Sequence, residues 1–260
     1  MTARVIAIAN QKGGVGKTTT CVNLASALAE SQRRVLLIDL DPQGNATMGC
    51  GVDSREQEIT SGEVLLGHVT IHQARHSLSE LDFDLVPGNS ALTAAEVRLM
   101  EMLAREQRLR SAIETVRQEY QYILIDCPPS LNMLTVNALT AADGVLIPMQ
   151  CEYYALEGLT SLLDTINQIQ TVVNPGLQIE GLLRTMFDVR NNLSNEVSNE
   201  LVKHFGEKVY HTIVPRNVRV AEAPSYGQPV IQYDRSSRGA IAYQGVAGEM
   251  MRREPGTLST

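Results

Sequence analysis

The chain lacks tryptophan, and aromatic residues make up only 4% of its 260 positions. Its four cysteines, at positions 21, 50, 127 and 151, show none of the paired spacings typical of disulfide frameworks or zinc sites. No apolar run approaches the roughly 18–20 residues that cross a membrane, and the first residues lack the apolar core of a signal peptide. These absences argue against a secreted, disulfide-stapled domain and against a membrane-spanning protein, so we expect a cytoplasmic one.

Positive charge is also scarce, because 22 Lys and Arg residues face 29 Asp and Glu residues and leave a net charge of −7. This total by itself argues against an electrostatic nucleic-acid binder. The distribution is uneven, since residues 184–260 contain ten basic and eight acidic side chains, whereas residues 1–183 contain twelve and 21. Any basic surface should therefore come from the last third of the chain.

The apolar residues, 43% of the chain, fall into short runs that alternate with segments of helical periodicity. Several runs are apolar at consecutive positions, as expected for strands covered by helices on both faces. Strands that alternate with helices indicate a mostly parallel sheet. We predict a single α/β domain over residues 1–260, with an ordered core at about 4–250 and a polar C-terminal tail. The expected strands are 5–9, 35–40, 81–86, 122–125, 145–149, 179–186 and 209–214, and the expected helices are 18–30, 91–117, 131–142, 155–173 and 195–205.

The first polar motif, NQKGGVGKTTT, joins the expected strand 5–9 to the helix 18–30. Its glycines let backbone N–H groups approach phosphate oxygens, and the helix N-terminus adds the positive end of a dipole. Lys17 should reach the β- and γ-phosphates, Thr18 should bind Mg²⁺, and Thr19 should reach the α-phosphate. The motif predicts a fold of P-loop NTPase type, with a nucleotide site formed by Lys12, Gly13, Gly14, Val15, Gly16, Lys17, Thr18 and Thr19.

Two acidic motifs follow later strands. In DLDPQGN, Asp39 and Asp41 are separated by one residue and would point the same way in an extended chain. A carboxylate there can order the attacking water or support the Mg²⁺ shell. In YILIDCPPS, Asp126 ends a buried strand, the usual place of a carboxylate that holds Mg²⁺ through water. A solvated acidic turn and a structural aspartate are the respective alternatives.

The phosphate loop departs from the common signature, because Gln11 stands where glycine is expected and Lys12 adds a second lysine. With KGGVGKTT, the segments DLDPQGN, DCPPS, CEYYALEGL and PRNVRVAEAPSYG resemble the ParA/Soj family of deviant Walker-type ATPases, which act in chromosome and plasmid partition. The resemblance covers about residues 4–249. The first motif alone also fits MinD and the nitrogenase iron protein, and the later ones are typical of small, chromosomal Soj-like members.

The resemblance implies ATP and Mg²⁺ as cofactors and a slow, partner-stimulated hydrolysis of ATP. In the family two subunits sandwich two nucleotides, and Lys12 matches the signature lysine that reaches the partner's phosphates. Asp41 is the residue most tied to hydrolysis, with Asp39 in support, and Gly13 lies where the subunits approach. The alternative for Lys12 is contact with its own phosphate or with solvent. The segment with Pro215 and Asn217 is expected near adenine.

The resemblance also implies an ATP-dependent homodimer that binds double-stranded DNA without sequence preference, associates with the nucleoid and works with a ParB-like partner. Arg190 and Arg219 match positions implicated in DNA binding. Arg216 is a weaker candidate, and Arg235 and Arg238 would extend the same basic surface. Little chain precedes the phosphate loop, so we expect no N-terminal helix-turn-helix domain.

Two other functions remain as alternatives. A MinD-like membrane-positioning ATPase needs a basic amphipathic helix at the C-terminus, but Pro255 and Gly256 should halt the helix and the tail is polar, so we expect no membrane partner. A metabolic P-loop enzyme that transfers phosphate to a small substrate would leave Lys12 unexplained.

Two further patterns are given little weight. His68, His72 and His76 are spaced by four residues, but Thr70 is a better helix N-cap than a mid-helix residue, so we expect no metal there. Tyr153 and Tyr154 open an apolar helix and should lie in the core or an interface.

Overall fold

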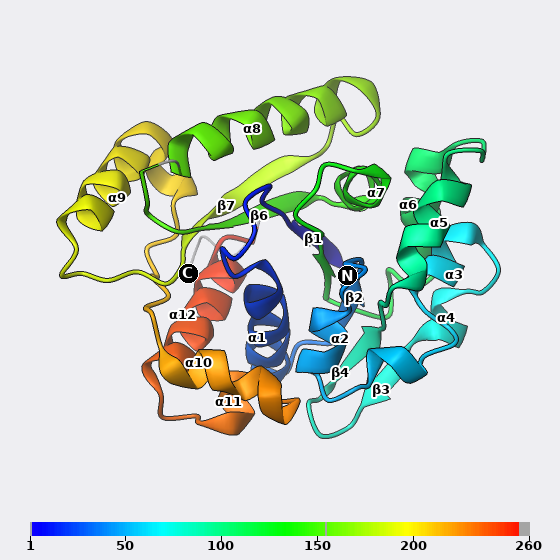
Figure 1. The fold of residues 1–260 in the computed structure, drawn as a ribbon, viewed down its shortest axis with the longest axis horizontal. Coiled ribbons are helices and arrows are strands. Elements are labelled where there is room, and N and C mark those ends of the chain that lie inside the picture. The colour runs from blue at the N-terminus through cyan, green and yellow to red at the C-terminus, as the bar shows by residue number, and fades with distance from the viewer. Residues whose placement is uncertain (1, 154, 255–260) are drawn as a thin grey trace.

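The structure is a computed structural model that describes residues 2–153 and 155–254 (Figure 1). The expectations for Tyr154, Pro255 and Gly256 lie outside the described residues. A seven-stranded sheet forms the centre, in the order β3-β4-β2-β5-β1-β6-β7. All neighbouring strands are parallel except β3 and β4, which pair antiparallel. The strands are β1 (Arg4–Ile8), β2 (Val35–Asp39), β3 (His76–Leu78), β4 (Phe83–Val86), β5 (Tyr122–Asp126), β6 (Gly144–Met149) and β7 (Gln178–Arg184).

Helices cover both faces of this sheet, as the apolar strands predict. In β1, Val5 and Ala7 belong to one apolar core while Ile6 and Ile8 belong to the other, so successive side chains are buried on opposite faces. On one face lie α1 (Lys17–Glu30), α2 (Asn45–Gly49), α11 (Val230–Tyr233) and α12 (Arg238–Arg252). On the other lie α3 (Ser61–Leu66), α4 (Ile71–Ala74), α5 (Ala91–Leu99), α6 (Arg108–Glu114), α7 (Met133–Ala141), α8 (Ala155–Val172) and α9 (Asn192–Phe205).

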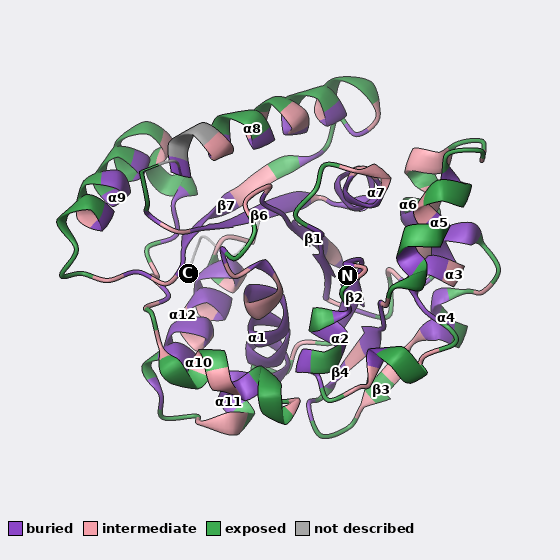
Figure 2. Ribbon diagram, in the orientation of Figure 1, coloured by how far each residue is buried: buried purple, intermediate pink, exposed green. Residues whose placement is uncertain are grey.

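Burial follows the same layers. Figure 2 shows α1 and the central strands almost wholly buried, whereas the outer sides of α8 and α9 are exposed. Tyr153, which was expected in the core or an interface, is 73% exposed and therefore does not belong to the core of the chain. None of the helices among the described residues is both long and apolar enough to span a bilayer.

The expected strand 209–214 is wrong, because only Val209 makes a bridge, to Leu182. The buried carboxylate of Glu249 on α12 accepts the N–H groups of His211 and Thr212 at 2.8 and 2.9 Å. Those N–H groups are thereby withdrawn from a strand ladder. The acceptor comes from 38 residues further along the chain, so local pattern could not reveal it.

The expected helix 91–117 is also wrong as a single element. It divides into α5, a 3-10 turn at Arg105–Gln107, and α6. Ala104 adopts a left-handed φ of 51°, which a continuous helix does not allow. The Arg105 guanidinium donates to the carbonyl of Met100 at 2.8 Å, and this bond closes the break.

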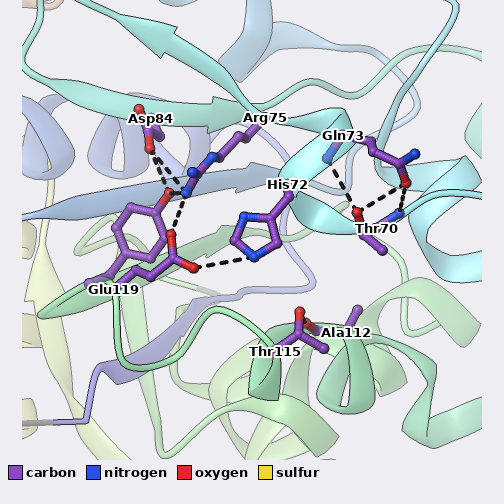
Figure 3. Close-up of polar contacts among 9 residues, drawn as sticks. Thr70, His72, Gln73, Arg75, Asp84, Ala112, Thr115 and Glu119 are labelled. Carbon is purple, nitrogen blue, oxygen red and sulfur yellow. Dashed lines mark hydrogen bonds and ion pairs between the residues drawn. The ribbon is translucent and has the colours of Figure 1, made fainter.

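The histidine series belongs to separate contacts. Thr70 is the N-cap of α4 and forms a capping box with Gln73, as expected from the sequence (Figure 3). In the same view His72 is directed at Glu119, with Nε2 and Oε1 3.2 Å apart, beside Arg75. His68 instead contacts Glu63 at 2.6 Å, and His76 lies in β3. These residues therefore do not converge on one point.

Candidate nucleotide site

A hollow of about 360 Å³ lies at the carboxyl ends of the central strands, the edge at which parallel α/β sheets bind ligands. It collects side chains from the loops after β1, β2, β5 and β7. The register places Asp126 opposite both Asp39 of β2 and Ile8 of β1, so the three loops start at one level. The lining residues are Gly13, Gly14, Gly16, Lys17, Thr18, Thr19, Asp41, Gln43, Asn45, Pro129 and Met186.

The loop after β1 has the backbone that a phosphate cradle requires. Gly14 and Gly16 adopt left-handed φ values of 73° and 86°, which favour glycine. Gly16 is the N-cap of α1, and no side chain caps that helix. The first N–H groups of α1 are therefore left for an anion. The loop is braced from outside, because the Thr185 hydroxyl donates to the carbonyl of Val15 at 2.7 Å.

Lys17 is the cation of this hollow. It is only 7% exposed, and its Nζ donates to the carbonyl of Lys12 at 3.3 Å. Burial lowers the pKa of Lys17, while the neighbouring Asp126 raises it. A negatively charged phosphate would favour the charged form in the same way as Asp126 does.

Asp126 fits a divalent cation. It is fully buried, and neither carboxylate oxygen completes a hydrogen bond to any residue in the described part of the chain. Burial, and then the charge of Asp39, raise the pKa of Asp126 well above its ordinary value, while Thr18 and Lys17 lower it. A buried polar atom without a partner is uncommon in proteins. A hard cation held between Asp126 and the Thr18 hydroxyl would supply the missing partner.

The structure separates the two aspartates that were expected to point the same way. Asp41 lines the hollow, and its Oδ1 accepts the N–H of Gln43 at 3.0 Å. Asp39 is fully buried beneath the loop, where it accepts the N–H groups of Asp41 and Thr47. Burial raises the pKa of Asp39 to about 6, against the hydrogen bonds from Thr47. Only Asp41 of the pair can meet a nucleotide directly.

The geometry is that of a nucleoside triphosphate site, and relatives agree with it. A family profile described as an AAA domain matches residues 3–179. The chromosome partitioning protein ParA of Caulobacter vibrioides is 50% identical, over 96% of this chain and 95% of that protein. The sporulation initiation inhibitor protein Soj of Bacillus subtilis is 51% identical, over 95% of this chain and 98% of that protein. The chain belongs to the ParA/Soj family.

A solved structure supports the same fold. The Mycobacterium smegmatis protein titled cobyrinic acid a,c-diamide synthase, solved with an ATP analogue and magnesium, superposes with a TM-score of 0.85. It is 38% identical and covers 96% of this chain and 95% of that chain. The predictions of a P-loop α/β fold and of a partition-type ATPase are thereby confirmed.

The two residues at which this ParA/Soj chain departs from the common phosphate-loop signature both face the segment after β6. The Nζ of Lys12 donates to Glu152 at 2.6 Å, and the Gln11 side chain donates to the Ser161 hydroxyl at 3.1 Å. The Lys12 side chain is 40% exposed and does not line the hollow. It is thus engaged in a partly exposed ion pair outside the lining of the hollow.

A second hollow of about 270 Å³ adjoins the first and shares Met186 with it. Met186 has a left-handed φ of 48°, an uncommon conformation for a residue other than glycine. The residues expected near adenine line neither hollow: Pro215 bridges Phe187, and the Asn217 side chain caps α10 (Val218–Glu222). The residues that line the second hollow are Gln150, Cys151, Glu152, Met186, Asp188, Asn191, Ser194 and Arg216.

Three lining residues were missed from the sequence. Gln43 and Asn45 belong to the motif that contains Asp41, so that motif could have indicated them. Met186 carries no sequence signal, because only the fold brings the end of β7 to the phosphate loop. Sequence motifs thus reveal the lining residues that follow β1 and β2 better than the one that follows β7.

The two main arginines singled out for DNA binding, Arg190 and Arg219, lie on the surface in ion pairs. Arg190 is paired with Asp188 at 2.8 Å, and this pairing lowers the pKa of Asp188 to about 2. Arg219, on α10, contacts Glu222 at 2.9 Å and Asp234 at 3.4 Å. Arg235 contacts Glu30 at 2.5 Å, and Arg216 lines the second hollow. Arg190 and Arg219 are thus each already paired with a carboxylate.

Proposed function

We propose that the protein is an ATP-dependent dimerising switch that binds DNA without sequence preference and drives chromosome or plasmid segregation with a ParB-like partner. The observation that carries this proposal is the outward direction of Lys12, which leaves its own hollow and pairs with Glu152 at the surface. A lysine placed there is suited to the phosphates of a second subunit, in the manner of an arginine finger.

The chain's own residues account for nucleotide binding. The N–H groups of residues 13–19 receive the phosphates, and Lys17 neutralises their charge. Thr18 and Asp126 would hold Mg²⁺, which neutralises phosphate charge when it is bound. The relative from M. smegmatis was solved with an ATP analogue and magnesium, which supports ATP and Mg²⁺ as the cofactors here.

Asp41 is the residue that we assign to hydrolysis. One of its oxygens accepts the N–H of Gln43, which fixes the direction of the carboxylate. Its other oxygen is then available to orient the water that attacks the γ-phosphate. Asp41 lines the hollow together with the phosphate loop and comes from the loop after β2. Asp39 supports Asp41 by accepting its backbone N–H and does not touch the nucleotide.

The charge of Lys12 accounts for the dependence of dimerisation on ATP. Two subunits that face each other through their phosphate loops bring two Lys12 side chains together, and the nucleotide phosphates offset this repulsion. Each Lys12 must leave Glu152 to do so, and an exposed ion pair of this kind is weak. Gly13, whose missing side chain leaves open space, permits the close approach of two loops.

DNA binding is assigned to Arg190 and Arg219, with Arg216 as a weaker contributor. Each of the first two is already paired with a carboxylate, so a DNA phosphate must displace that carboxylate. Such binding is directed at phosphates and weakens steeply with salt. A single acidic subunit binds weakly, and a dimer that combines two surfaces binds better. Hydrolysis to ADP and phosphate would separate the dimer and release the nucleoid.

The MinD-like alternative gains no support from the end of α12. The Glu254 carboxylate contacts the Tyr122 hydroxyl of β5, and the Arg253 guanidinium stacks 4.1 Å from the centre of the Tyr210 ring. The two residues that directly follow α12 are therefore packed against the body of the protein.

The proposal is tested by the molar mass of the protein in solution with ATP, ADP and no nucleotide. The wild type should dimerise with ATP only, and Lys12→Ala should stay monomeric while it still binds ATP. Lys203→Ala is the matched control, because Lys203 is an exposed lysine that faces Glu200 at 3.6 Å and lines neither hollow. A Lys12→Ala variant that dimerises like the wild type would reject the cross-subunit role.

A further inference from the structure

We infer that Asp39, Thr47 and Gly88 form a latch that positions the loop of residues 41–47 for hydrolysis, so that Asp39 and Thr47 act on turnover without touching ATP. We call these three residues the Asp39 latch. The inference rests on the proposed role of Asp41, and it adds Thr47 and Gly88 to the residues on which the reaction depends.

One carboxylate holds both ends of the loop. Oδ1 of Asp39 accepts the N–H of Asp41 at 3.0 Å, and Oδ2 accepts the N–H of Thr47 at 2.9 Å. The Thr47 hydroxyl donates to the same Oδ2 at 2.7 Å. The start and the end of the loop are thereby tied to the last residue of β2.

The Thr47 hydroxyl also ties the loop to the neighbouring strand. It accepts the N–H of Gly88, two residues after β4, at 2.9 Å. A side chain at Gly88 would not fit, because its Cβ would lie 2.6 Å from the Asp39 carbonyl oxygen and 2.9 Å from the Asp39 Cγ. The three residues are therefore packed against one another with no room for displacement.

Burial makes these contacts hard to replace. Asp39 and Thr47 are both fully buried, so water cannot take over a lost hydrogen bond. Gly44, in the middle of the loop, has a left-handed φ of 64°, and a Cβ there would lie 2.7 Å from the Gly88 carbonyl oxygen. The middle of the loop is thus packed against Gly88, the glycine whose N–H donates to the Thr47 hydroxyl.

The direction of Asp41 follows from this arrangement. The latch places the Asp41 N–H, and Asp41 in turn accepts the N–H of Gln43 at 3.0 Å. A loosened latch would misplace the Asp41 carboxylate, and a misplacement of about 1 Å can lower a rate by about a hundredfold. The phosphate loop and Lys17 follow a different strand, so ATP affinity should change little.

The test separates turnover from affinity. Thr47→Val keeps the shape of the side chain but removes the hydroxyl, and we expect kcat to fall roughly tenfold to a hundredfold with the Kd for ATP within about threefold of wild type. Thr47→Ser keeps the hydroxyl and should retain most of the turnover. Ser61→Ala is the control, because the Ser61 hydroxyl donates to the Asp39 backbone carbonyl at 2.6 Å and leaves the carboxylate untouched. Should Thr47→Val not fold, Thr47→Ala and Thr47→Ser give the same comparison of a small side chain with and without the hydroxyl.

A double-mutant cycle completes the test. If the latch acts through Asp41, Thr47→Val should have no further effect on turnover in an Asp41→Ala background. Wild-type turnover in Thr47→Val, or a loss of ATP affinity as large as the loss of kcat, would overturn the latch alone. Wild-type turnover in Asp41→Ala would instead reject the proposed role of Asp41, on which the latch rests.

Discussion

The nucleotide hollow and the arginine-bearing surface of this ParA/Soj chain use charge in opposite ways. At the hollow, Lys17, Asp39 and Asp126 are at most 7% exposed, and neighbouring loops fix their positions. On the surface, the side chains of Arg190 and Arg219 are 87% and 52% exposed and are paired with nearby carboxylates. Chemistry on a phosphate needs groups in fixed places, whereas attraction to a DNA backbone needs only charge that can be released.

The largest effect that sharpens this comparison is expected at Lys17. Lys17→Ala removes the buried cation of the hollow, and we expect ATP affinity to fall by about a hundredfold or more. Titration with a fluorescent ATP analogue measures this, with Lys203→Ala as the surface control. A Lys17→Ala variant with wild-type affinity would show that the hollow is not the phosphate site.

The second prediction concerns Asp126, where function and stability should change in opposite directions. Asp126→Asn should weaken Mg²⁺-dependent ATP binding roughly tenfold to a hundredfold. It should also raise the free energy of unfolding of the nucleotide-free protein by about 1–3 kcal/mol, because the buried carboxyl group must either carry an unpaired charge or take up a proton, and a neutral amide does neither. Isothermal titration and denaturant unfolding measure the two quantities.

The sign of the pH dependence at Asp126 provides a check on that interpretation. Folding raises the pKa of Asp126 above its unfolded value of about 3.9, so the folded state holds the proton more tightly. The wild type should therefore lose stability relative to Asp126→Asn as the pH rises above about 4. A stability difference that is constant from pH 4 to 8 would contradict the burial of an unpartnered carboxylate.

An intermediate effect is expected at Arg190, for which the chain offers a matched control. Arg55 makes the same contact with Asp53, two residues before it, as Arg190 makes with Asp188. Arg190→Ala should weaken the binding of the ATP-bound protein to random-sequence DNA by roughly tenfold and lower the salt slope by about one. Arg55→Ala should leave both unchanged. Equal effects of Arg190→Ala and Arg55→Ala on DNA binding would contradict the assignment of Arg190 to the DNA-binding surface.

The smallest expected effect is at Glu222, and it tests whether the carboxylates restrain the arginines. Glu222→Gln leaves Arg219 with the more distant Asp234, at 3.4 Å. DNA binding should then strengthen by about threefold, since a phosphate has less to displace. The measurement is fluorescence anisotropy at low salt. Weaker binding in Glu222→Gln would mean that Glu222 orients Arg219 for DNA and does not compete with it.

Much of the fold could be predicted because its signals are local. The apolar runs of β1, β2 and β5 are followed directly by the polar motifs that build most of the hollow. What was missed depends on distant partners. Glu249 prevents a strand at 209–214, and β3 is a three-residue edge strand whose pattern is too short to recognise.

The candidate site follows the same division as the fold, because its local features could be predicted and those that depend on distant partners could not. The placement of Lys17 in the lining of the hollow and of Asp126 at the end of a buried strand could be predicted, because a motif and an apolar run specify those positions. The different positions of Asp39 and Asp41 could not be predicted. Their spacing of two residues does not indicate that the Asp39 carboxylate accepts the N–H of Thr47. Of the residues expected near adenine, Pro215 is placed by its long-range bridge to Phe187, which no local pattern records, whereas Asn217 is held by a local cap of α10.

The most direct test of the switch is the binding of wild-type protein to random-sequence duplex DNA with ATP, ADP and no nucleotide, over a salt series and with molar mass measured in parallel. The account predicts a dimer and salt-sensitive DNA binding with ATP alone. An ATP-bound dimer that ignores DNA at low salt, or equal DNA binding in all three nucleotide states, would contradict it.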